Sequence, residues 1–453
     1  MSLPRNPAGV DAALVPALAL ALACGAWCEA VAQEPEVLPI DLTTALALAD
    51  ERNLDIAIYI ERIAEASARV AQARTLAVPT LRAGARRDRH TGNIQETGGQ
   101  VLDADRASQF TGIEAGLSIN IADAVFAPLV ARQNRAAVAA ASTANRHLVL
   151  LDVARAYLTL LESREETGIA QGALDRAVDL ARLTADYAEA GEGLLADAEM
   201  AAVQPLLWEQ RRLIAVERTE AAAAELARLL HLDPGVALEP LENGIPALAI
   251  FSGDEDVEEL VARALLDRPE AEQYDALVAA AEDDLNAQRY RLFIPSVSLD
   301  YGVGRFGGGP GSSIRNSDDR DDLMLSLSWQ FDNFGFGHRA RTDEKRAQLR
   351  QVSLERDQLR DGIAAEVREG HAQVRSFARQ LELVQSAVAR AEQAYRLNRE
   401  RIFDQQALPL EALQAMQTLA AAELADLAAR VGHALAEVRL HTVLGNPIDS
   451  EAP

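Results

Sequence analysis

Pro79-Thr80-Leu81 opens a stretch of alternating apolar and polar residues, and Pro295-Ser296-Val297 opens a second such stretch 216 positions later. Other short motifs recur at nearly the same interval. Asn53-Leu54-Asp55 precedes Arg268-Pro269-Glu270 by 215 positions. A near-constant offset indicates two copies of one structural unit, each consisting of a helix, a strand pair, a very long helix and a shorter helix.

The amino terminus has the pattern of an export signal. Arg5 supplies a positive charge, Ala12–Gly25 is a short apolar run, and Ala30-Val31-Ala32 is an A-x-A cleavage site. We therefore expect residues 1–32 to be a signal peptide. The alternative is a lipoprotein in which Cys24 is acylated. No later stretch approaches about 20 apolar residues, so no transmembrane helix is expected.

With the signal peptide removed, the first repeat would occupy residues 33–245 and the second 246–453. The formal net charge is -25, which argues against nucleic acid as a partner and predicts a surface or lumen that favours cations. Hydrophobic residues make up 49% of the chain, but aromatic residues only 4%. This composition suits slender helices that pack closely through small side chains.

Each repeat contains one helical segment far longer than the others. Asp123–Ala190 and His338–Gln405 each have 68 residues, which gives a rod of about 100 Å at 1.5 Å per residue. Helices of about half that length are expected over Leu42–Ala77, Leu194–Leu232 and Leu410–Leu444, so that two of them, end to end, can pair along one rod. Apolar residues form a seam on each rod: Leu150, Val153, Ala154, Tyr157, Leu158 and Leu161, and then Ile363, Val367, Val374, Ala378, Leu381 and Val384.

Period-two alternation predicts four strands, over residues 80–90, 110–121, 296–306 and 322–331. Residues 91–108 are Gly-rich and polar and are expected to form a long exposed loop. The strands have the length and alternation of lipid-facing barrel strands, although a half-buried antiparallel sheet would show the same pattern. The residues expected to face lipid are Ile113, Leu117, Ile119, Leu323, Leu325, Leu327 and Trp329.

Four membrane strands cannot close a barrel on their own. An open sheet edge in lipid leaves unpaired backbone groups, each of which costs several kcal/mol. Bacterial barrels have eight strands or more, and three copies of this chain would supply twelve. The sequence therefore predicts a mostly helical α+β protomer that forms a trimeric twelve-stranded barrel on an α-helical tunnel.

In their order and spacing, the motifs resemble the outer membrane efflux protein family, of the TolC type, over essentially the whole mature length. The resemblance rests on Pro79-Thr80-Leu81, Leu117-Ser118-Ile119, Val153–Leu158, Arg268-Pro269-Glu270, Pro295-Ser296-Val297 and Leu444-Gly445-Asn446-Pro447. It implies a passive outer-membrane exit duct, with its tunnel in the periplasm, for a tripartite efflux pump or a type I secretion system. The implied partners are two further copies of the chain, outer membrane lipid, a periplasmic adaptor (membrane fusion) protein and an inner-membrane transporter.

The resemblance also points to residues at the tunnel tips. The turn at Gly191–Asp197 is similar to the family's helix-tip motif, which implies adaptor contacts at Gly191, Leu194, Leu195 and Asp197. The second repeat departs from that motif: Ala412 stands where the family's tunnel-closing Asp would be. The candidate gate residues are Glu400, Asp404 and Glu411, although a solvated acidic helix face explains the same residues.

No catalytic, cofactor-binding or metal-ligating set stands out, and we expect no enzyme. Gly302–Gly307 spells G-x-G-x-x-G, but the following Gly308-Gly309-Pro310-Gly311 excludes the helix that a dinucleotide site requires, so a barrel loop is expected there. The alternative to a channel is a periplasmic coiled-coil scaffold. In that protein Leu323, Leu325, Leu327 and Trp329 would pack against protein rather than lipid.

Overall fold

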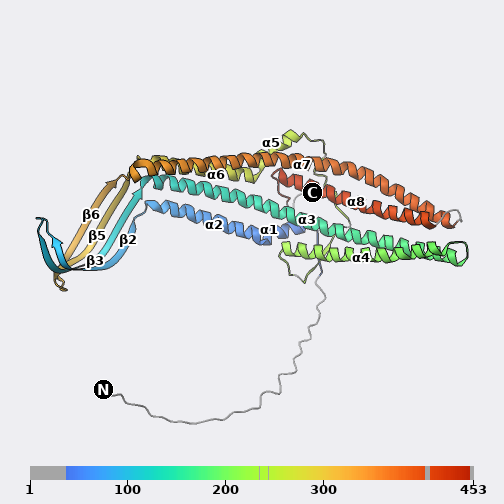
Figure 1. The fold of residues 1–453 in the computed structure, drawn as a ribbon, viewed down its shortest axis with the longest axis horizontal. Helices are drawn as coiled ribbons and strands as arrows, with labels where there is room; N and C mark the ends of the chain where they lie inside the picture. Colours follow the sequence, from blue (N-terminus) through green and yellow to red (C-terminus); the bar gives the residue numbers. More distant parts are fainter. Residues whose placement is uncertain (1–36, 234, 243, 252, 404–408, 449–453) are drawn as a thin grey trace, which may run out of the picture.

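The computed structural model describes residues 37–448, apart from 234, 243, 252 and 404–408. The expected signal peptide at 1–32, with Cys24, and the gate candidate Asp404 therefore lie outside the described residues. Figure 1 shows a long helical body with a sheet at one end and, at the other, the far ends of the helix pairs α3–α4 and α7–α8. Judged by length and hydropathy, none of the described helices could cross a membrane.

The two repeats share the order of helix pair, strand pair, long helix and shorter helix, whereas β1, β4 and the 3-10 helices differ between them. The first contains β1 (Val37–Ile40), α1 (Leu42–Arg52), α2 (Leu54–Arg74), η1 (Thr75–Ala77), β2 (Thr80–Gln95), β3 (Val101–Asn120), α3 (Ile121–Glu189), α4 (Leu195–Leu229) and β4 (Ala237–Pro240). The second contains α5 (Val257–Asp267), α6 (Pro269–Tyr290), β5 (Ser296–Pro310), β6 (Arg315–Ser328), η2 (Asp332–Gly335), α7 (Phe336–Phe403) and α8 (Pro409–Val443).

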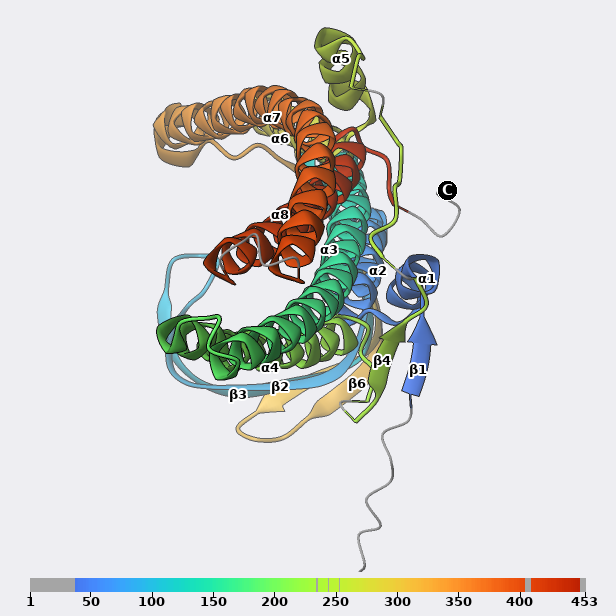
Figure 2. The same cartoon turned by 90° about the vertical axis from the view of Figure 1, so that its right-hand side faces the viewer.

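The two long helices carry the shorter ones along their length. α3 has 69 residues and α7 has 68, close to the expected rods. α4 packs along the part of α3 nearer the tip, and α2 packs along the part nearer the sheet (Figure 1). α8 and α6 are arranged in the same way along α7. Figure 2 shows that the helices together form a curved layer.

The helix expected over Leu42–Ala77 is interrupted at Asn53, so the prediction of one continuous helix was wrong. Asn53 has an extended backbone (φ −67°, ψ 127°), and its side-chain oxygen accepts hydrogen bonds from the first N–H groups of α2. Its side-chain amide donates to the Leu229 carbonyl oxygen at 3.0 Å. The residue therefore caps α2 and ties it to the end of α4.

The prediction of an exposed loop over residues 91–108 was also wrong. β2 continues to Gln95 and β3 begins at Val101, so most of that segment is paired strand around a short turn. The side chains there are polar, but they satisfy one another across the hairpin, as in the ion pair of 3.2 Å between Arg89 and Asp105. The backbone ladder therefore continues where the side-chain pattern gives no indication of it.

The strands of the second repeat also differ from the expected bounds. Gly302–Gly307 lies inside β5 rather than in a loop. A Cβ added at Gly304 would lie 2.5 Å from a carbonyl oxygen of β3, so this glycine permits a close approach of the two strands. β6 begins at Arg315, seven residues before the expected start, and ends at Ser328, before Trp329.

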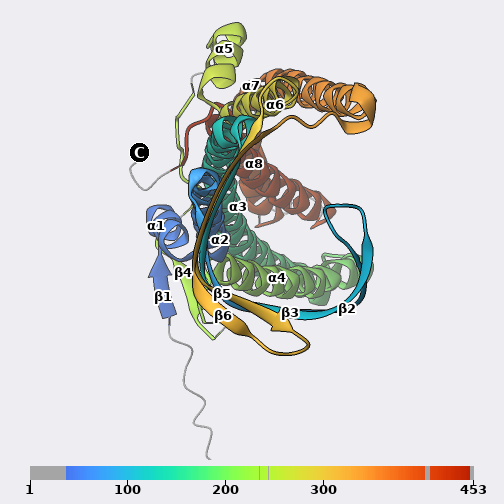
Figure 3. The same ribbon diagram turned by 90° about the vertical axis from the view of Figure 1, so that its left-hand side faces the viewer.

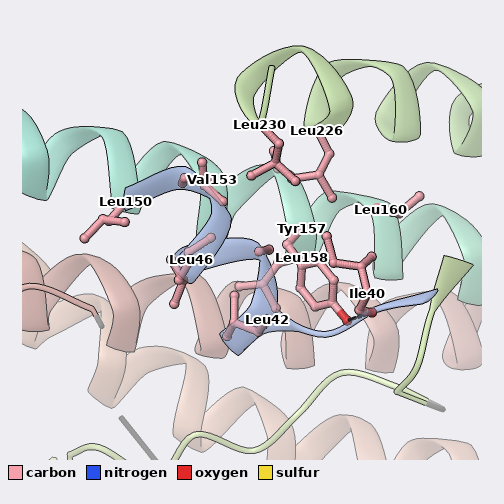
Figure 4. Packing of buried hydrophobic residues seen from close by; sticks show 14 of the residues in the cluster. Ile40, Leu42, Leu46, Leu150, Val153, Tyr157, Leu158, Leu160, Leu226 and Leu230 are labelled. Atoms are coloured by element: carbon pink, nitrogen blue, oxygen red, sulfur yellow. Dashed lines mark hydrogen bonds between the residues drawn. The ribbon is translucent and has the colours of Figure 1, made fainter. Parts of the chain in front are cut away.

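The largest buried cluster surrounds the middle of α3 (Figure 4). The Tyr157 hydroxyl is shared between the Ile40 carbonyl oxygen and the Glu242 carboxylate, and burial together with that carboxylate raises the pKa of Tyr157. Ile40 ends β1, which pairs in parallel with β4.

All the seam residues expected on α3 are buried: Leu150, Val153, Ala154, Tyr157, Leu158 and Leu161. On α7, Ile363, Val367 and Val374 are buried, whereas Ala378, Leu381 and Val384 are half-buried.

We predict that His147 makes the stability of this body dependent on pH. The side chain is buried on α3, and burial, followed by Arg146, lowers its pKa while Glu270 opposes the shift. The folded state therefore binds fewer protons than the unfolded state, whose pKa is about 6.5. The contribution of the neutral His147 side chain to stability is therefore complete above a pH of about 6.5. It is lost as the pH falls through the pKa that His147 has in the folded state.

Urea unfolding midpoints of the wild type and of His147→Gln at several pH values between 7.5 and 5 would test this. The wild type should lose more stability than the variant as the pH falls, because only the wild type gains a proton at this position on unfolding. Equal pH slopes for the two proteins would contradict the prediction.

Candidate functional site: the sheet faces and the helix tips

The four strands that follow the helix pairs form one antiparallel sheet in the order β2-β3-β5-β6. Each repeat supplies one hairpin, and the two hairpins pair through β3 and β5. Figure 3 shows this sheet from its end of the molecule, where the strands are strongly curved rather than flat. β2 and β6 are the edge strands and have one unpaired side each.

One apolar face runs across all four strands. Leu117 lies opposite Leu299, and Leu299 lies opposite Leu325. Since successive residues of a strand point to opposite faces, the odd-numbered apolar residues of these strands share one face. Six of the residues expected to face lipid lie on it: Ile113, Leu117, Ile119, Leu323, Leu325 and Leu327. The seventh, Trp329, lies just beyond the end of β6.

No described helix or strand covers this apolar face, and Figure 1 shows the sheet standing clear of the helical body. Leu323 and Leu325 keep 71% and 67% of their surface exposed in the protomer. Such an apolar band is larger than the scattered exposed leucines of an ordinary soluble protein and indicates a surface that is covered by something else.

The opposite face of the sheet is polar and small-residue-rich. Gly112, Gly116, Ser118, Ser298, Asp300, Gly302, Gly304 and Ser326 lie on it. Its aromatic residues are Phe110 and Phe306, which lie opposite each other, and the Arg320 guanidinium lies 4.8 Å from the centre of the Phe306 ring. The half of the sheet nearer the helices is therefore amphipathic, with polar residues on one face and hydrocarbon on the other. In the outer half, Arg87, Arg305 and Asp321 place charges on the second face as well.

The first helix tip is a tight turn between α3 and α4. Gly191 has φ +77°, a left-handed conformation that favours glycine. Leu194 and Leu195 are exposed at 68% and 72%, and Asp197 lies in the first turn of α4, where a negative charge is favourable. The structure thus brings the four expected tip residues together at the end of the molecule far from the sheet (Figure 1).

Two of the gate candidates at the second tip, Glu400 and Glu411, lie among the described residues. Glu411 lies 3.4 Å from Arg401 in an ion pair, and Glu400 is an exposed residue of α7. Ala412, where the family motif would have aspartate, is fully buried in an apolar cluster with Met416. A carboxylate at position 412 would therefore lie between helices of this protomer, not on an open surface.

Two contacts between the hairpins were missed by sequence reasoning. The Tyr187 hydroxyl donates to the Ile402 carbonyl oxygen at 2.5 Å, and Arg176 on α3 forms an ion pair of 2.6 Å with Glu423 on α8. Both are half-buried and join the first helix hairpin to the second. Tyr187, an aromatic residue one turn before Gly191, was the only sequence feature that could have suggested the first contact.

These features define a class: a protomer with an amphipathic four-stranded sheet on a body of long antiparallel helices, as in outer-membrane channel-tunnels. The fold is similar to that of the outer-membrane channel OprN (TM-score 0.79, 20% identity, 89% of this chain and 90% of that one). It is also similar to the outer membrane protein VceC of Vibrio cholerae (TM-score 0.78, 16% identity, 90% of this chain and 97% of that one).

Sequence comparisons agree with the fold. The family model described as "Outer membrane efflux protein" matches residues 260–446. The pyoverdine export outer membrane protein OpmQ of Pseudomonas aeruginosa is 26% identical over 420 residues, covering 91% of this chain and 86% of that protein. The chain is therefore similar to outer membrane efflux proteins, in sequence over residues 260–446 and in its overall fold.

We predict that two glycine-to-alanine substitutions have opposite effects. Gly191→Ala should destabilise the hairpin by about 1 kcal/mol, because alanine resists a positive φ. Gly168→Ala, in the middle of α3 with no atom within 4 Å of the added Cβ, should stabilise the helix by about 1 kcal/mol. Denaturation midpoints of both variants would test this, and shifts in the same direction would contradict it.

Proposed function

We propose that this chain is a passive exit duct of the outer membrane, in which three copies close a twelve-stranded barrel and continue it as a helical tunnel in the periplasm. The observation that carries the proposal is the bare apolar face that crosses all four strands, opposite a polar face. Hydrocarbon is the environment that suits the first face, and a water-filled channel suits the second. The unpaired edges of β2 and β6 support closure with further copies, because lipid cannot satisfy them.

We further propose a tripartite assembly around this duct. The exposed Leu194 and Leu195 at the first tip would contact a periplasmic adaptor, with Gly191 shaping the turn and Asp197 beginning α4. An inner-membrane transporter would supply the energy. The efflux description of the family and the pyoverdine export named for the curated relative favour efflux of a solute over secretion of a polypeptide.

A periplasmic scaffold is the competing function. It requires protein to cover the apolar face of the sheet, yet Leu323 and Leu325 are bare in the protomer. A scaffold would also have no use for the alternation of apolar and polar residues in the half of each strand nearer the helices. Both observations favour the duct.

We predict that Leu325→Arg prevents membrane assembly whereas Met324→Arg does not. Leu325 lies within the apolar band, where a lipid-facing arginine costs about 2–4 kcal/mol near the bilayer midplane. Met324 is its neighbour on β6 but points to the polar face, so it is a matched control.

The measurement is the mass of each protein after extraction of purified outer membranes in mild detergent. Wild type and Met324→Arg should be recovered as trimers, and Leu325→Arg should be depleted from this fraction. A wild-type monomer or dimer in the soluble periplasmic fraction would overturn the duct and favour the scaffold.

We predict that Leu195→Asp reduces adaptor binding whereas Leu206→Asp does not. Both leucines lie on α4 and are 72% exposed, but Leu195 is at the tip and Leu206 is three turns away. Co-purification of a periplasmic adaptor from the native host, normalised to recovered trimer, would measure the difference. Equal adaptor recovery by both variants would contradict the assignment of the tip.

A further inference from the structure

The two edge strands of the sheet have opposite net charge. β2 carries Arg82, Arg86, Arg87, Asp88 and Arg89. β6 carries Arg315, Asp318, Asp319, Arg320, Asp321 and Asp322. All of these residues are exposed in the protomer, where some of them pair within their own strand, as Arg86 does with Asp88 at 2.9 Å and Arg320 with Asp322 at 2.7 Å. Each edge therefore presents a row of charges to whatever strand pairs with it.

We propose that β6 of one protomer pairs with β2 of the next in a single register, with Asp322 opposite Arg86 of the neighbouring protomer, and that this charge pattern makes the chain select its own copies. The inference rests on the trimeric barrel proposed above and adds the seam that closes it. Because β2, β3, β5 and β6 alternate in direction, β6 and a neighbouring β2 meet antiparallel.

The apolar face restricts the choice of register. A slip of one residue would turn one strand's apolar side chains to the polar face, so only steps of two residues are allowed. With Asp322 opposite Arg86, all 14 residues of β6 fall within the 16 residues of β2. In that register the apolar face continues from one protomer to the next, with Leu325 opposite Ala83 and Leu327 opposite Leu81 of the neighbouring protomer.

Charge then selects one register among those allowed. With Asp322 opposite Arg86, four opposite-charge pairs form and no like-charge pair does: Asp322 with Arg86, Asp321 with Arg87, Arg320 with Asp88 and Asp319 with Arg89. A slip of two residues in one direction brings Asp322 against Asp88. The same slip in the other direction brings Arg320 against Arg86 and Asp318 against Asp88. Directly opposed like charges destabilise a strand pair and opposite charges stabilise it, so the first register is favoured.

Barrel geometry is compatible with this register and excludes one without stagger, while charge decides between it and the neighbouring registers. Within the protomer, one row of paired residues runs from Leu81 through Ala115 and Tyr301 to Leu323. In the proposed seam Leu323 lies opposite Ala85 of the next protomer, which is four residues further along β2 than Leu81. A row followed once around the barrel, through three protomers, would therefore return to its first strand twelve residues further along. With strands about 4.8 Å apart and about 3.3 Å per residue, twelve strands would tilt by about 35°. Membrane barrels tilt by about 35–45°, whereas Asp322 opposite Arg82 would give no tilt.

The charge pairs of the seam are divided between the polar and the apolar face of the sheet. On the polar face, Arg86 and Asp88 of one protomer and Arg320 and Asp322 of the next would form a square of alternating charges at each of the three seams. On the other face, the two remaining pairs lie at the outer end of the apolar band, beyond Leu323 and Ala85, where Asp321 is opposite Val303.

Disulfide mapping tests the register directly. Met324→Cys with Gly84→Cys, and Leu325→Cys with Ala83→Cys, place cysteines opposite each other in the proposed seam. One of two adjacent pairs is non-hydrogen-bonded, with Cα atoms about 4.5 Å apart, within disulfide range. The controls, Met324→Cys with Arg82→Cys and Leu325→Cys with Ala85→Cys, are displaced by two residues, about 6.6 Å along the strand.

Mild oxidation in outer membranes should convert at least one proposed pair, and neither control pair, into covalent dimers and trimers on denaturing gels. Cross-linking of a control pair, or of neither proposed pair in a protein that still extracts as a trimer, would overturn the register and leave the duct intact. A wild type that is not a trimer would overturn the duct itself, so the two failures are distinguishable.

Charge exchange tests selectivity. Asp321→Arg with Asp322→Arg places three consecutive arginines of β6 against Arg86 and Arg87 of the neighbour, and most of the extractable trimer should be lost. Adding Arg86→Asp and Arg87→Asp to the same chain exchanges the two edges and should restore trimer to near the wild-type amount. An undiminished trimer in the first variant would overturn the proposal, and so would cross-linking of the restored trimer at a control pair.

Discussion

Lipid offers no hydrogen-bond partner to the unpaired N–H and C=O groups of a strand edge, and β2 and β6 each present such an edge. In the proposed duct this constraint governs the rest of the architecture, because a protomer that supplies four strands would have to obtain closure from other copies. The helices beneath the sheet would then share the symmetry of the barrel. A tunnel would follow from that barrel, since each hairpin of the sheet continues into a long helix, as β3 does into α3.

The helical body is held mainly by small apolar contacts and by a few polar anchors at its middle. Asn53 and Tyr157 both tie segments that are distant in sequence, the first to the end of α4 and the second to β1 and the Glu242 carboxylate. Buried polar groups of this kind specify where two helices meet, because a displaced partner would leave them unsatisfied. The long helices supply length, and these anchors set their relative position.

The duplicated order, the long helices, the seam on α3 and the apolar sheet face were predictable because each leaves a periodic pattern in the sequence. The break at Asn53 was not, since its side chain forms its long-range bond with Leu229 and the residue fits the apolar period of the helix. The outer half of the β2–β3 hairpin and the β1–β4 pair were also missed. The first has polar side chains on both faces, and the second has strands of four residues, too short for alternation to be seen.

The second tip shows how a repeat can keep a fold while losing a motif. Ala412 is buried beside Met416, and the backbone of Ile402 is held by the Tyr187 hydroxyl of the first hairpin. An aspartate at position 412 would put an unpaired charge into that apolar cluster, which is costly unless a partner is present. The two hairpins therefore pack through apolar surface where the motif would have carboxylates. In the proposed trimer, a described residue that could contribute to a ring of negative charge at this end is the exposed Glu400 on α7.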